Sequence, residues 1–346
     1  MLNKRKSIVG LDIGSNEVKA VELTRHGDSV RVTGFGWGRL PSQEALSETI
    51  EMVLQKANIK TRRVATAVSG RSVIVRYINL PVMTEGELKS ALRFEADKYI
   101  PFEIDEVALD GQKLEELESP LDGEREMKVL MVAAKKSLIQ EHVTMIQDLG
   151  LIPTVIDVDT FALGNAFELR ALQSGRLGES EDIAALVDIG ATKTNISILK
   201  GHTTYFSREV YLGGNDLTEA VARHLAIDTA EAEELKRNPQ GRELELEEAL
   251  LPSLDDLANE IHLSFDYFEN QFDREVGDVY LSGGCVRTPG LEAVMERVFD
   301  RRVHLWDPTE NLELKGDRID PEELREHASQ LPIAVGLGAR LLDAAQ

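Results

Sequence analysis

Cysteine is nearly absent from this chain of 346 residues, and histidine is sparse. The one cysteine, Cys285, cannot form a disulfide within the chain, which favours a reducing compartment. We expect Cys285 to be a small core residue and not a reactive thiol. The seven histidines lie singly along the sequence, so no zinc site is indicated.

The sequence also lacks apolar segments of the kind that place a protein in a membrane. No apolar run approaches the roughly 18 residues that a membrane-spanning helix requires. The first residues, MLNKRKSIVG, are basic but lead directly into a predicted strand instead of the apolar core of a signal peptide. We therefore expect a cytoplasmic protein.

Basic residues are far fewer than acidic residues. Lysine and arginine number 39 against 61 aspartates and glutamates, which gives a formal net charge of −22. This balance argues against binding to nucleic acid and against direct adhesion to anionic lipid, because both surfaces would repel the chain. Docking of a basic peptide remains compatible with it. The length is sufficient for two domains with cores of their own.

No Walker A sequence occurs, so a phosphate site would need another kind of turn. In Ile8–Leu23, two β-type apolar runs flank a short polar turn, which predicts a β-hairpin. Its backbone amides, hydroxyl and lysine suit a phosphate, and its carboxylate suits hydrated Mg²⁺. Alone, such a turn most often only connects two strands. The residues concerned are Asp12, Gly14, Ser15, Asn16 and Lys19.

The same pattern returns in the second half of the chain, in Ala185–Leu199. Again a strand ends in Asp-Ile-Gly, a small polar turn follows and a strand returns. A repeat this widely spaced indicates two related domains and not a solenoid, whose period is far shorter. Two such hairpins facing each other would hold a polyphosphate from both sides, which favours a nucleotide. The corresponding residues are Asp188, Gly190, Ala191, Thr192 and Thr194.

Two glycine pairs precede predicted helices. Gly213 and Gly214 would place free amides and the positive end of a helix dipole near an anion, although a plain loop-to-helix turn explains them equally well. Gly283 and Gly284 follow a predicted strand, Val279–Leu281, and precede another helix.

Three helices have clear sequence signals. The stretches 84–87 and 137–140 fit capping boxes at helix starts. Apolar and aromatic residues at helical spacing predict a long helix over Ser253–Phe272, with its aromatic stripe in the core.

The three glycine turns, at 12–16, 188–192 and 282–284, resemble the phosphate-1, phosphate-2 and adenosine motifs of the actin/hexokinase/Hsp70 superfamily. The resemblance implies an α/β fold of the actin-like ATPase type, with two lobes that each hold a mixed β-sheet flanked by helices. Longer stretches are similar to the PilM family of type IV pilus assembly, which is related to the division protein FtsA. They cover essentially the whole chain and include 91–107, 129–136, 149–168 and 213–221.

The resemblance also implies a division of the chain. The expected first lobe is 1–80, an FtsA-like inserted subdomain is 81–158, and 159–180 returns to the first lobe and hinge. The expected second lobe is 181–335, and a C-terminal helix at 336–346 lies back on the first lobe.

Members of this family bind ATP between the lobes, and the resemblance assigns residues to the parts of such a site. Asp12 and Asp188 would hold Mg²⁺. The ribose and adenine would lie against Glu233, Lys236, Gly283, Gly284 and Arg287. The phosphates would lie against Gly14, Ser15 and Lys19 on one side, and against Gly190, Ala191, Thr192 and Thr194 on the other. The turns themselves, as described above, add Asn16, Gly213 and Gly214 as candidates for the same phosphates.

Asp159 occupies a hinge position that carries a glutamate in many members of the superfamily. It is the candidate for orienting a water, and Asp12 and Asp188 complete the predicted catalytic set. Because its side chain is one methylene shorter, it reaches less far toward a water, and we expect at most slow hydrolysis of ATP.

The resemblance implies protein partners. PilM proteins capture the N-terminal cytoplasmic tail of the membrane protein PilN and link the inner-membrane platform to the motor ATPases. This chain is thus expected at the inner face of the inner membrane, associated with it only through partners, and self-association is left open. We expect a groove for a basic-ended tail between the helix Thr84–Ile100 and the first lobe. Acidic residues at 95–97 and 103–106 would form its rim.

Two other functions remain open. A small-molecule kinase or phosphatase of this superfamily would need a dedicated base near the γ-phosphate, which the sequence does not identify. An FtsA-like membrane-tethered filament would need a basic amphipathic helix at the C-terminus, and the final residues 341–346 are too short and too acidic for that.

Overall fold

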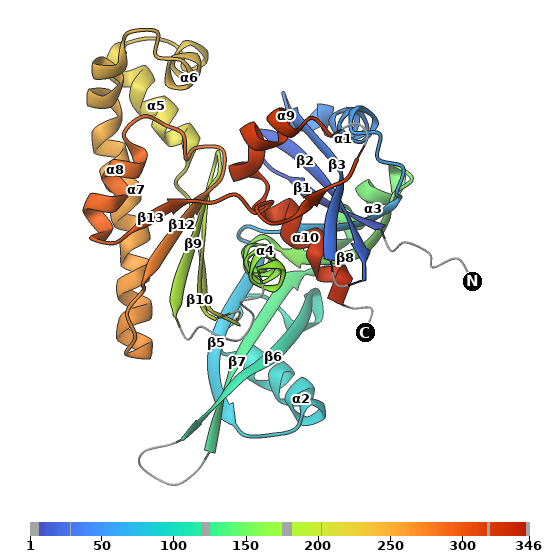
Figure 1. The fold of residues 1–346 in the computed structure, drawn as a ribbon. Coiled ribbons are helices and arrows are strands. Elements are labelled where there is room, and N and C mark those ends of the chain that lie inside the picture. Colours follow the sequence, from blue (N-terminus) through green and yellow to red (C-terminus); the bar gives the residue numbers. More distant parts are fainter. Residues whose placement is uncertain are drawn as a thin grey trace.

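The computed structural model describes residues 7–27, 29–118, 125–174, 182–201, 203–316 and 319–343. Their strands form sheets of six, five and three strands. The two larger sheets belong to two lobes that stand side by side, and the three-stranded sheet forms a smaller subdomain beneath them (Figure 1). The predicted actin-like arrangement of two lobes and one inserted subdomain is confirmed. Among the described residues, no helix has both the length and the apolar character needed to cross a membrane.

The first lobe is built on the six-stranded sheet, whose order is β14-β3-β2-β1-β4-β8. The first two strands pair in an antiparallel hairpin that sets Asp12 opposite Lys19, as the sequence predicts. The strands of the six-stranded sheet are β1 (Ser7–Ile13), β2 (Glu17–His26), β3 (Ser29–Arg39), β4 (Arg63–Val68), β8 (Ile152–Val158) and β14 (Glu313–Leu314). Its helices are α1 (Leu46–Lys56), α3 (Lys136–Asp148), α4 (Asp159–Gln173), α9 (Pro321–His327) and α10 (Pro332–Asp343).

Helix α10 lies directly on the middle of this sheet. A Cβ atom on Gly10 of β1 would stand 1.8 Å from the backbone oxygen of Ala334, and one on Gly336 would stand 1.8 Å from that of Ala162. Backbones can approach this closely only where glycine removes the side chain. The pair α4 and α10 therefore forms a thin layer over the sheet, close to the second lobe (Figure 1).

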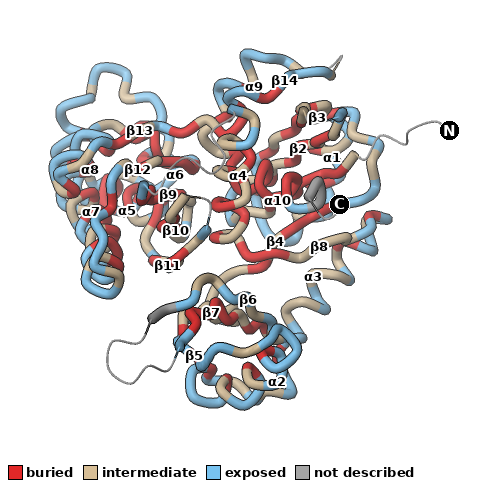
Figure 2. The backbone as a smooth tube through the Cα atoms, turned by 60° about the horizontal axis from the view of Figure 1, so that its bottom comes forward, coloured by how far each residue is buried: buried red, intermediate tan, exposed pale blue. Residues whose placement is uncertain are grey.

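The second lobe repeats the plan with the order β11-β10-β9-β12-β13. All seven residues of its central strand β9 are buried, because the sheet packs between helices on both sides (Figure 2). The strands are β9 (Ile183–Ile189), β10 (Thr194–Lys200), β11 (Thr203–Val210), β12 (Asp278–Ser282) and β13 (Val303–Leu305). The helices are α5 (Gly214–Leu225), α6 (Thr229–Arg237), α7 (Glu243–Phe272) and α8 (Leu291–Phe299).

The inserted subdomain has the sheet order β5-β7-β6, covered on one face by α2. Its core includes Leu88 and Leu92 of α2 and Met127 and Met131 of β7. The elements are β5 (Val73–Pro81), α2 (Glu85–Ala96), β6 (Val107–Glu118) and β7 (Arg125–Lys135).

Three of the predicted domain boundaries are wrong, because strands near them pair with the sheet of another part of the molecule. Strand β5, expected in the first lobe, pairs with β7 of the inserted subdomain, and β8, expected in that subdomain, pairs with β4 of the first lobe. The second lobe also ends earlier than expected, because residues 313–314 already pair with β3 of the first lobe. Pairing partners lie far apart along the chain, so local sequence patterns could not identify them. Parts of the expected segments 159–180 and 336–346, namely 175–180 and 344–346, lie outside the described residues.

Of the three helices predicted from sequence signals, one begins with the predicted cap and two begin earlier than predicted. The capping box at Thr84 and Glu87 is present with both of its hydrogen bonds. The one predicted at Ser137 is wrong, because α3 starts one residue earlier, after Lys135, and no side chain caps it. Helix α7 begins at Glu243, ten residues before the predicted start, and contains Pro252.

Candidate functional site

A cavity of about 740 Å³ lies between the two lobes, where the three glycine turns meet. Most of the residues predicted for the site line it. From the first lobe and hinge these are Asp12, Gly14, Ser15, Asn16, Lys19 and Asp159. From the second lobe they are Asp188, Gly190, Ala191, Thr192, Gly214, Glu233, Lys236, Gly284 and Arg287. Thr194, Gly213 and Gly283 are not among the lining residues.

The first turn presents one lysine among carboxylates. The Nζ atom of Lys19 lies 3.3 Å from Oδ2 of Asp12 and 3.9 Å from Oε2 of Glu17. Burial alone would lower the pKa of Lys19, but the charges of Asp12 and Glu17 outweigh it, and the net pKa is raised. The lysine therefore remains charged and faces the cavity.

The second turn contributes a buried aspartate. Asp188, at the end of β9, is 7% exposed and accepts a hydrogen bond of 3.1 Å from Oγ of Ser282. Burial raises its pKa to about 6; the charge of Lys19 opposes the rise and that of Asp12 adds to it. Burial likewise raises the pKa of Asp12. Two buried carboxylates thus share the charge of one lysine.

This excess of negative charge fits a divalent cation. Mg²⁺ is usually held by one or two carboxylates, with waters and substrate phosphates as its other ligands. Among the residues that the structure describes, no group of three His, Cys, Asp or Glu side chains is placed to hold a metal ion. The donor set therefore suits an ion that arrives with phosphate and not a metal bound by the protein alone.

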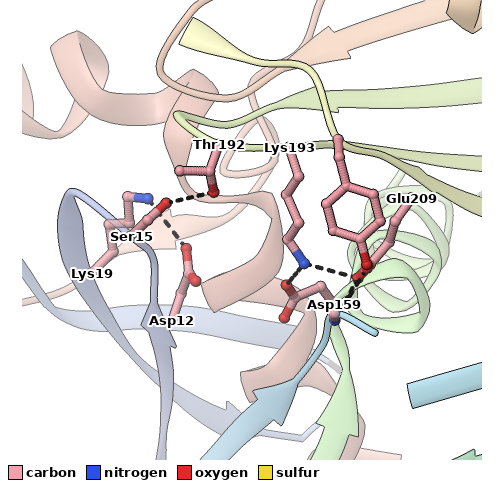
Figure 3. Close-up of polar contacts among 9 residues, drawn as sticks. Asp12, Ser15, Lys19, Asp159, Thr192, Lys193 and Glu209 are labelled. Atoms are coloured by element: carbon pink, nitrogen blue, oxygen red, sulfur yellow. Dashed lines mark hydrogen bonds and ion pairs between the residues drawn. The ribbon is translucent and has the colours of Figure 1, made fainter. Parts of the chain in front are cut away.

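The tips of the two turns touch across the cavity. Oγ of Ser15 lies 3.0 Å from Oγ1 of Thr192 (Figure 3). Beside this contact, Nδ2 of Asn16 donates to Oδ1 of Asn215, at the start of α5, at 3.3 Å. The symmetry expected from the sequence repeat is therefore present in space.

The expectation of free amides at Gly213 and Gly214 is wrong. The Gly213 amide donates to Oδ2 of Asp216 at 2.8 Å, and the Gly214 amide donates to the Gly190 oxygen at 2.9 Å. Helix α5 thus docks its N-terminus on the second turn and has few donors left for an anion. Thr194 is also structural, because its buried hydroxyl donates to the Leu212 oxygen at 2.8 Å.

The two glycines of the third turn have different surroundings and different roles. Gly283 has φ +100°, and a Cβ there would lie 2.3 Å from the Ile189 oxygen, so this glycine lets the turn pack against β9. The first atom that a Cβ on Gly284 would meet is Oε2 of Glu17, at 4.0 Å. The backbone at Gly284 is therefore open toward the cavity, as a surface for a flat group requires.

Cys285 follows this turn as a protonated thiol. Its Sγ donates to the Gly190 oxygen at 3.3 Å, and burial raises its pKa to about 11. Its predicted role as a small packing residue is consistent with both observations.

Glu233 and Lys236 of α6 line the cavity and form an ion pair. Nζ of Lys236 lies 2.7 Å from Oε2 of Glu233 and donates to the Gly214 oxygen at 2.9 Å. Burial would raise the pKa of Glu233, but hydrogen bonds from Lys236 and Thr218 lower it to about 2. The glutamate thus stays ionised and remains an acceptor.

Sequence reasoning missed a network around Asp159. Nζ of Lys193 lies 2.8 Å from Oδ2 of Asp159 and 2.8 Å from Oε1 of Glu209 (Figure 3). Burial would lower the pKa of Lys193, but these two carboxylates raise it overall. Lys193 directly follows the second turn, which could have drawn attention to it; Glu209 lies on a strand without any motif. The carboxylate expected to orient a water is already held by a lysine.

Sequence reasoning also missed three residues of the first lobe that line the cavity. The rings of Trp37 and His327 stack at 4.3 Å between centroids and 23° between planes. Both residues line the cavity, and so does Arg39. Trp37 lies on β3, where it pairs with Lys19 of β2, whereas His327 lies on α9, close to the end of the chain. No local pattern connects these segments.

Comparison with curated proteins finds FtsA and EutJ among the relatives of this chain. FtsA of Streptococcus pneumoniae (serotype 2, strain D39) is 20% identical over 353 aligned residues, which cover 87% of this chain and 75% of FtsA. The ethanolamine utilization protein EutJ of Salmonella typhimurium (strain LT2) is 31% identical over 126 residues, or 36% of this chain. That match spans only 42% of EutJ.

Solved structures agree on the fold. A PilM-PilN type IV pilus biogenesis complex contains a chain with a TM-score of 0.83 and 30% identity, covering 97% of this chain and 98% of that one. MreB5 of Spiroplasma citri bound to ADP has a TM-score of 0.52 at 10% identity over 98% of this chain and 96% of its own, and it shows the fold alone.

The family model described as type IV pilus assembly protein PilM matches residues 10–341. This range contains all three glycine turns, both lobes and the inserted subdomain. The chain therefore belongs to the PilM family of actin-like ATPases.

Proposed function

We propose that this protein is an ATP-binding scaffold of type IV pilus assembly. The observation that carries the proposal is the cavity between the lobes, where the first and second turns meet over Lys19 and the buried aspartates. MreB5, a structural neighbour of the same fold, is bound to ADP in one structure and to AMPPNP in another.

Lys19 and the first and second turns would hold the phosphates. Asp12 and Asp188 would face Mg²⁺, whose charge would balance that of the phosphates and of the two carboxylates. Glu233 would accept from the ribose or base, and the open backbone at Gly284 would face the adenine. Gly213, Gly283 and Thr194 would support this site through packing and hydrogen bonding.

Hydrolysis would be slow. The Asp159 carboxylate lies at the hinge and lines the cavity, which suits a water-orienting role. Its ion pair with Lys193 opposes that role, because a carboxylate held by a cation accepts a proton less readily. This arrangement supports a protein that holds ATP and turns it over rarely.

We also propose that the N-terminal cytoplasmic tail of PilN docks on the inserted subdomain, since the similar solved chain is part of a PilM-PilN complex. A hollow of about 420 Å³ lies between α2 and β6, the edge strand of its sheet, and reaches the start of α3. An extended tail could add to that edge and place aliphatic side chains in the hollow. The apolar lining residues are Leu92, Ile104, Val107, Ala108 and Leu109.

The hollow differs from the expected groove. Its lining residues all lie between 89 and 136, so none comes from the first-lobe sheet. It carries Lys89, Arg93 and Lys136, with Asp110 as its carboxylate. Of the expected acidic rim, Asp105 pairs with Arg93 at 3.2 Å and Glu95 pairs with Lys98 at 2.7 Å. Apolar contacts would therefore contribute more to docking than charge.

Two binding measurements test this function. Calorimetry should detect ATP with Mg²⁺ binding to the full chain. Fluorescence anisotropy should detect a labelled synthetic peptide that begins with a few aliphatic residues and ends in arginine, with micromolar affinity or better. Absence of nucleotide binding would refute the ATP-binding scaffold. Absence of peptide binding would refute only the docking proposal, and with it the placement at the inner membrane through PilN and the link to the motor.

The similarity to FtsA favours one second candidate, an ATP-dependent filament. Sedimentation of the protein with and without ATP and Mg²⁺ separates the two functions, since a filament pellets in a nucleotide-dependent manner and a scaffold does not.

A further inference from the structure

One side of strand β11 carries a row of contacts to the segment that forms the inserted subdomain. Residues 207, 209 and 211 alternate along the strand and its end, so their side chains share one face. Residue 205, next to the register shift of the strand, contacts the same subdomain. We call these residues the β11 seam: Tyr205, Ser207, Glu209 and Tyr211.

Two seam residues bond to the subdomain's sheet. Oη of Tyr205 donates to Oε2 of Glu115 on β6 at 2.8 Å. Oγ of Ser207 lies 3.0 Å from Oη of Tyr77 on β5. Because β5 and β11 are edge strands of different sheets, these contacts join two units that share no backbone ladder.

The other two seam residues contact the turn that leads into β5. The Gly70 amide donates to both carboxylate oxygens of Glu209, at 3.2 and 3.1 Å. The guanidinium of Arg71 lies 5.2 Å from the centroid of the Tyr211 ring, which is a cation–π distance. Beside the seam, Nζ of Lys128 on β7 lies 3.4 Å from the ring centroid of Phe272.

Lys193 connects this seam to the cavity. It directly follows the second turn and lines the cavity, and its Nζ bonds to Glu209 and Asp159 at 2.8 Å each (Figure 3). The lysine thus holds one carboxylate of the seam and one of the hinge. A polyphosphate in the cavity would compete with Glu209 for this ammonium group, because its anionic oxygens offer the lysine another partner.

We propose that Lys193 is a positioning residue that couples the cavity to the inserted subdomain through the β11 seam. Polyphosphate in the cavity draws Lys193 away from Glu209, the seam loosens, and β5 opens more readily to solvent. Since β5, β7 and β6 form one sheet, the change reaches the hollow beside β6. This inference rests on the proposed nucleotide function.

Hydrogen exchange of the full chain, read on peptides that cover 73–81, tests the coupling. The probe is AMPPNP with Mg²⁺, which excludes effects of turnover. We expect AMPPNP to raise exchange at 73–81 on the order of fivefold or more in the wild type, the usual lower range of coupling between two sites. In Lys193→Met, exchange should already be raised without nucleotide, and AMPPNP should add little.

Matched variants separate positioning from general destabilisation. Lys193→Arg keeps the charge and should retain the response. Lys56→Met removes another ion-paired lysine, 3.1 Å from Glu323 and away from the seam, and should behave as the wild type. Ser207→Ala should raise exchange at 73–81 without nucleotide and should not weaken AMPPNP binding, because coupling is reciprocal and a loosened seam favours the nucleotide-bound state. If Lys193→Met does not fold, Glu209→Gln takes its place, because it removes the charge that Lys193 holds.

Two outcomes would overturn the proposal. One is AMPPNP binding that leaves exchange at 73–81 unchanged in the wild type. The other is a Lys193→Met protein that matches Lys56→Met with and without nucleotide. Absence of AMPPNP binding, seen by calorimetry, would refute the proposed function itself. Even then, exchange in Lys193→Met without nucleotide would show whether this lysine holds the seam.

Discussion

Oγ of Ser15 and Oγ1 of Thr192 lie 3.0 Å apart, although 177 positions separate them in the sequence. Each hydroxyl lies at the tip of one copy of the repeated hairpin. Their contact brings the two lobes together over Lys19 and the buried aspartates. A phosphate chain in the cavity would therefore lie next to a contact to which both copies of the hairpin contribute.

Removal of a charge from the proposed phosphate site should weaken nucleotide binding. We expect Lys19→Ala and Asp188→Asn each to reduce ATP·Mg²⁺ affinity by about ten- to a hundredfold. A hydrogen bond to a charged group contributes about 1.5–3 kcal/mol. Calorimetry on folded variants measures the change, and Lys56→Ala serves as an exposed control. Wild-type affinity in both variants would show that the phosphates bind elsewhere.

Asp188→Asn should have the opposite effect on the stability of the nucleotide-free protein. Because the native pKa is raised from 3.8 to about 6, this carboxyl favours folding fully below pH 3.8, and the contribution is lost as the pH rises through about 6. At pH 7 the buried carboxylate costs at most about 3 kcal/mol, at 1.36 kcal/mol per pKa unit. We expect the variant to gain stability over the wild type between pH 4 and pH 7.

Urea unfolding at several pH values measures this difference. Taking the difference between the two proteins cancels the titration of other groups. A stability difference that does not change with pH would contradict the raised pKa of Asp188.

ATP turnover should be slow, below about 1 s⁻¹, which is the low end of typical enzyme rates. The physical reason is the ion pair of 2.8 Å between Lys193 and Asp159, which occupies the best candidate for orienting a water. Phosphate release under single-turnover conditions gives the rate. Asp159→Ala should reduce it further; rapid release that survives this change would exclude Asp159 from catalysis.

Cys285 should react slowly with thiol reagents. Its pKa of about 11, against an ordinary value of 9.0, makes the thiolate about a hundredfold rarer at neutral pH, and the thiolate is the reactive form. Iodoacetamide labelling followed by mass spectrometry gives the rate, with the urea-unfolded chain as the reference. Equal rates in the folded and unfolded chains would show that the thiol is neither buried nor protonated as described.

Gly10→Ala should destabilise the protein by about 1–3 kcal/mol or more, the usual cost of overpacking. The added Cβ would lie 1.8 Å from the Ala334 oxygen, and backbone cannot move aside as a flexible side chain can. Gly86→Ala is a matched control, because a Cβ there meets nothing within 4 Å and alanine favours the helix. Thermal unfolding compares the two. Equal stability of both variants would mean that α10 does not pack on β1 as closely as described.

The sequence by itself determined the features that depend on neighbouring residues. The turn at Gly14, the repeated turn at Gly190 and the capping box at Thr84 each follow from a short run of residues whose backbone preferences agree. The three glycine turns indicated the actin-like fold, and longer stretches such as 91–107 and 149–168 indicated the PilM family, which the family model and the solved PilM-PilN complex confirm. Fifteen of the eighteen predicted site residues therefore line one cavity.

Only the tertiary structure decided which partner each polar group meets. The amides of Gly213 and Gly214 were expected to be free, but the second turn and Asp216 use them. Lys193 finds Asp159 and Glu209, and the sheet that β5 joins is set by β7. The physical reason is that a hydrogen bond or ion pair depends on distance in space, which residues far apart in the chain acquire only through the packing of whole elements.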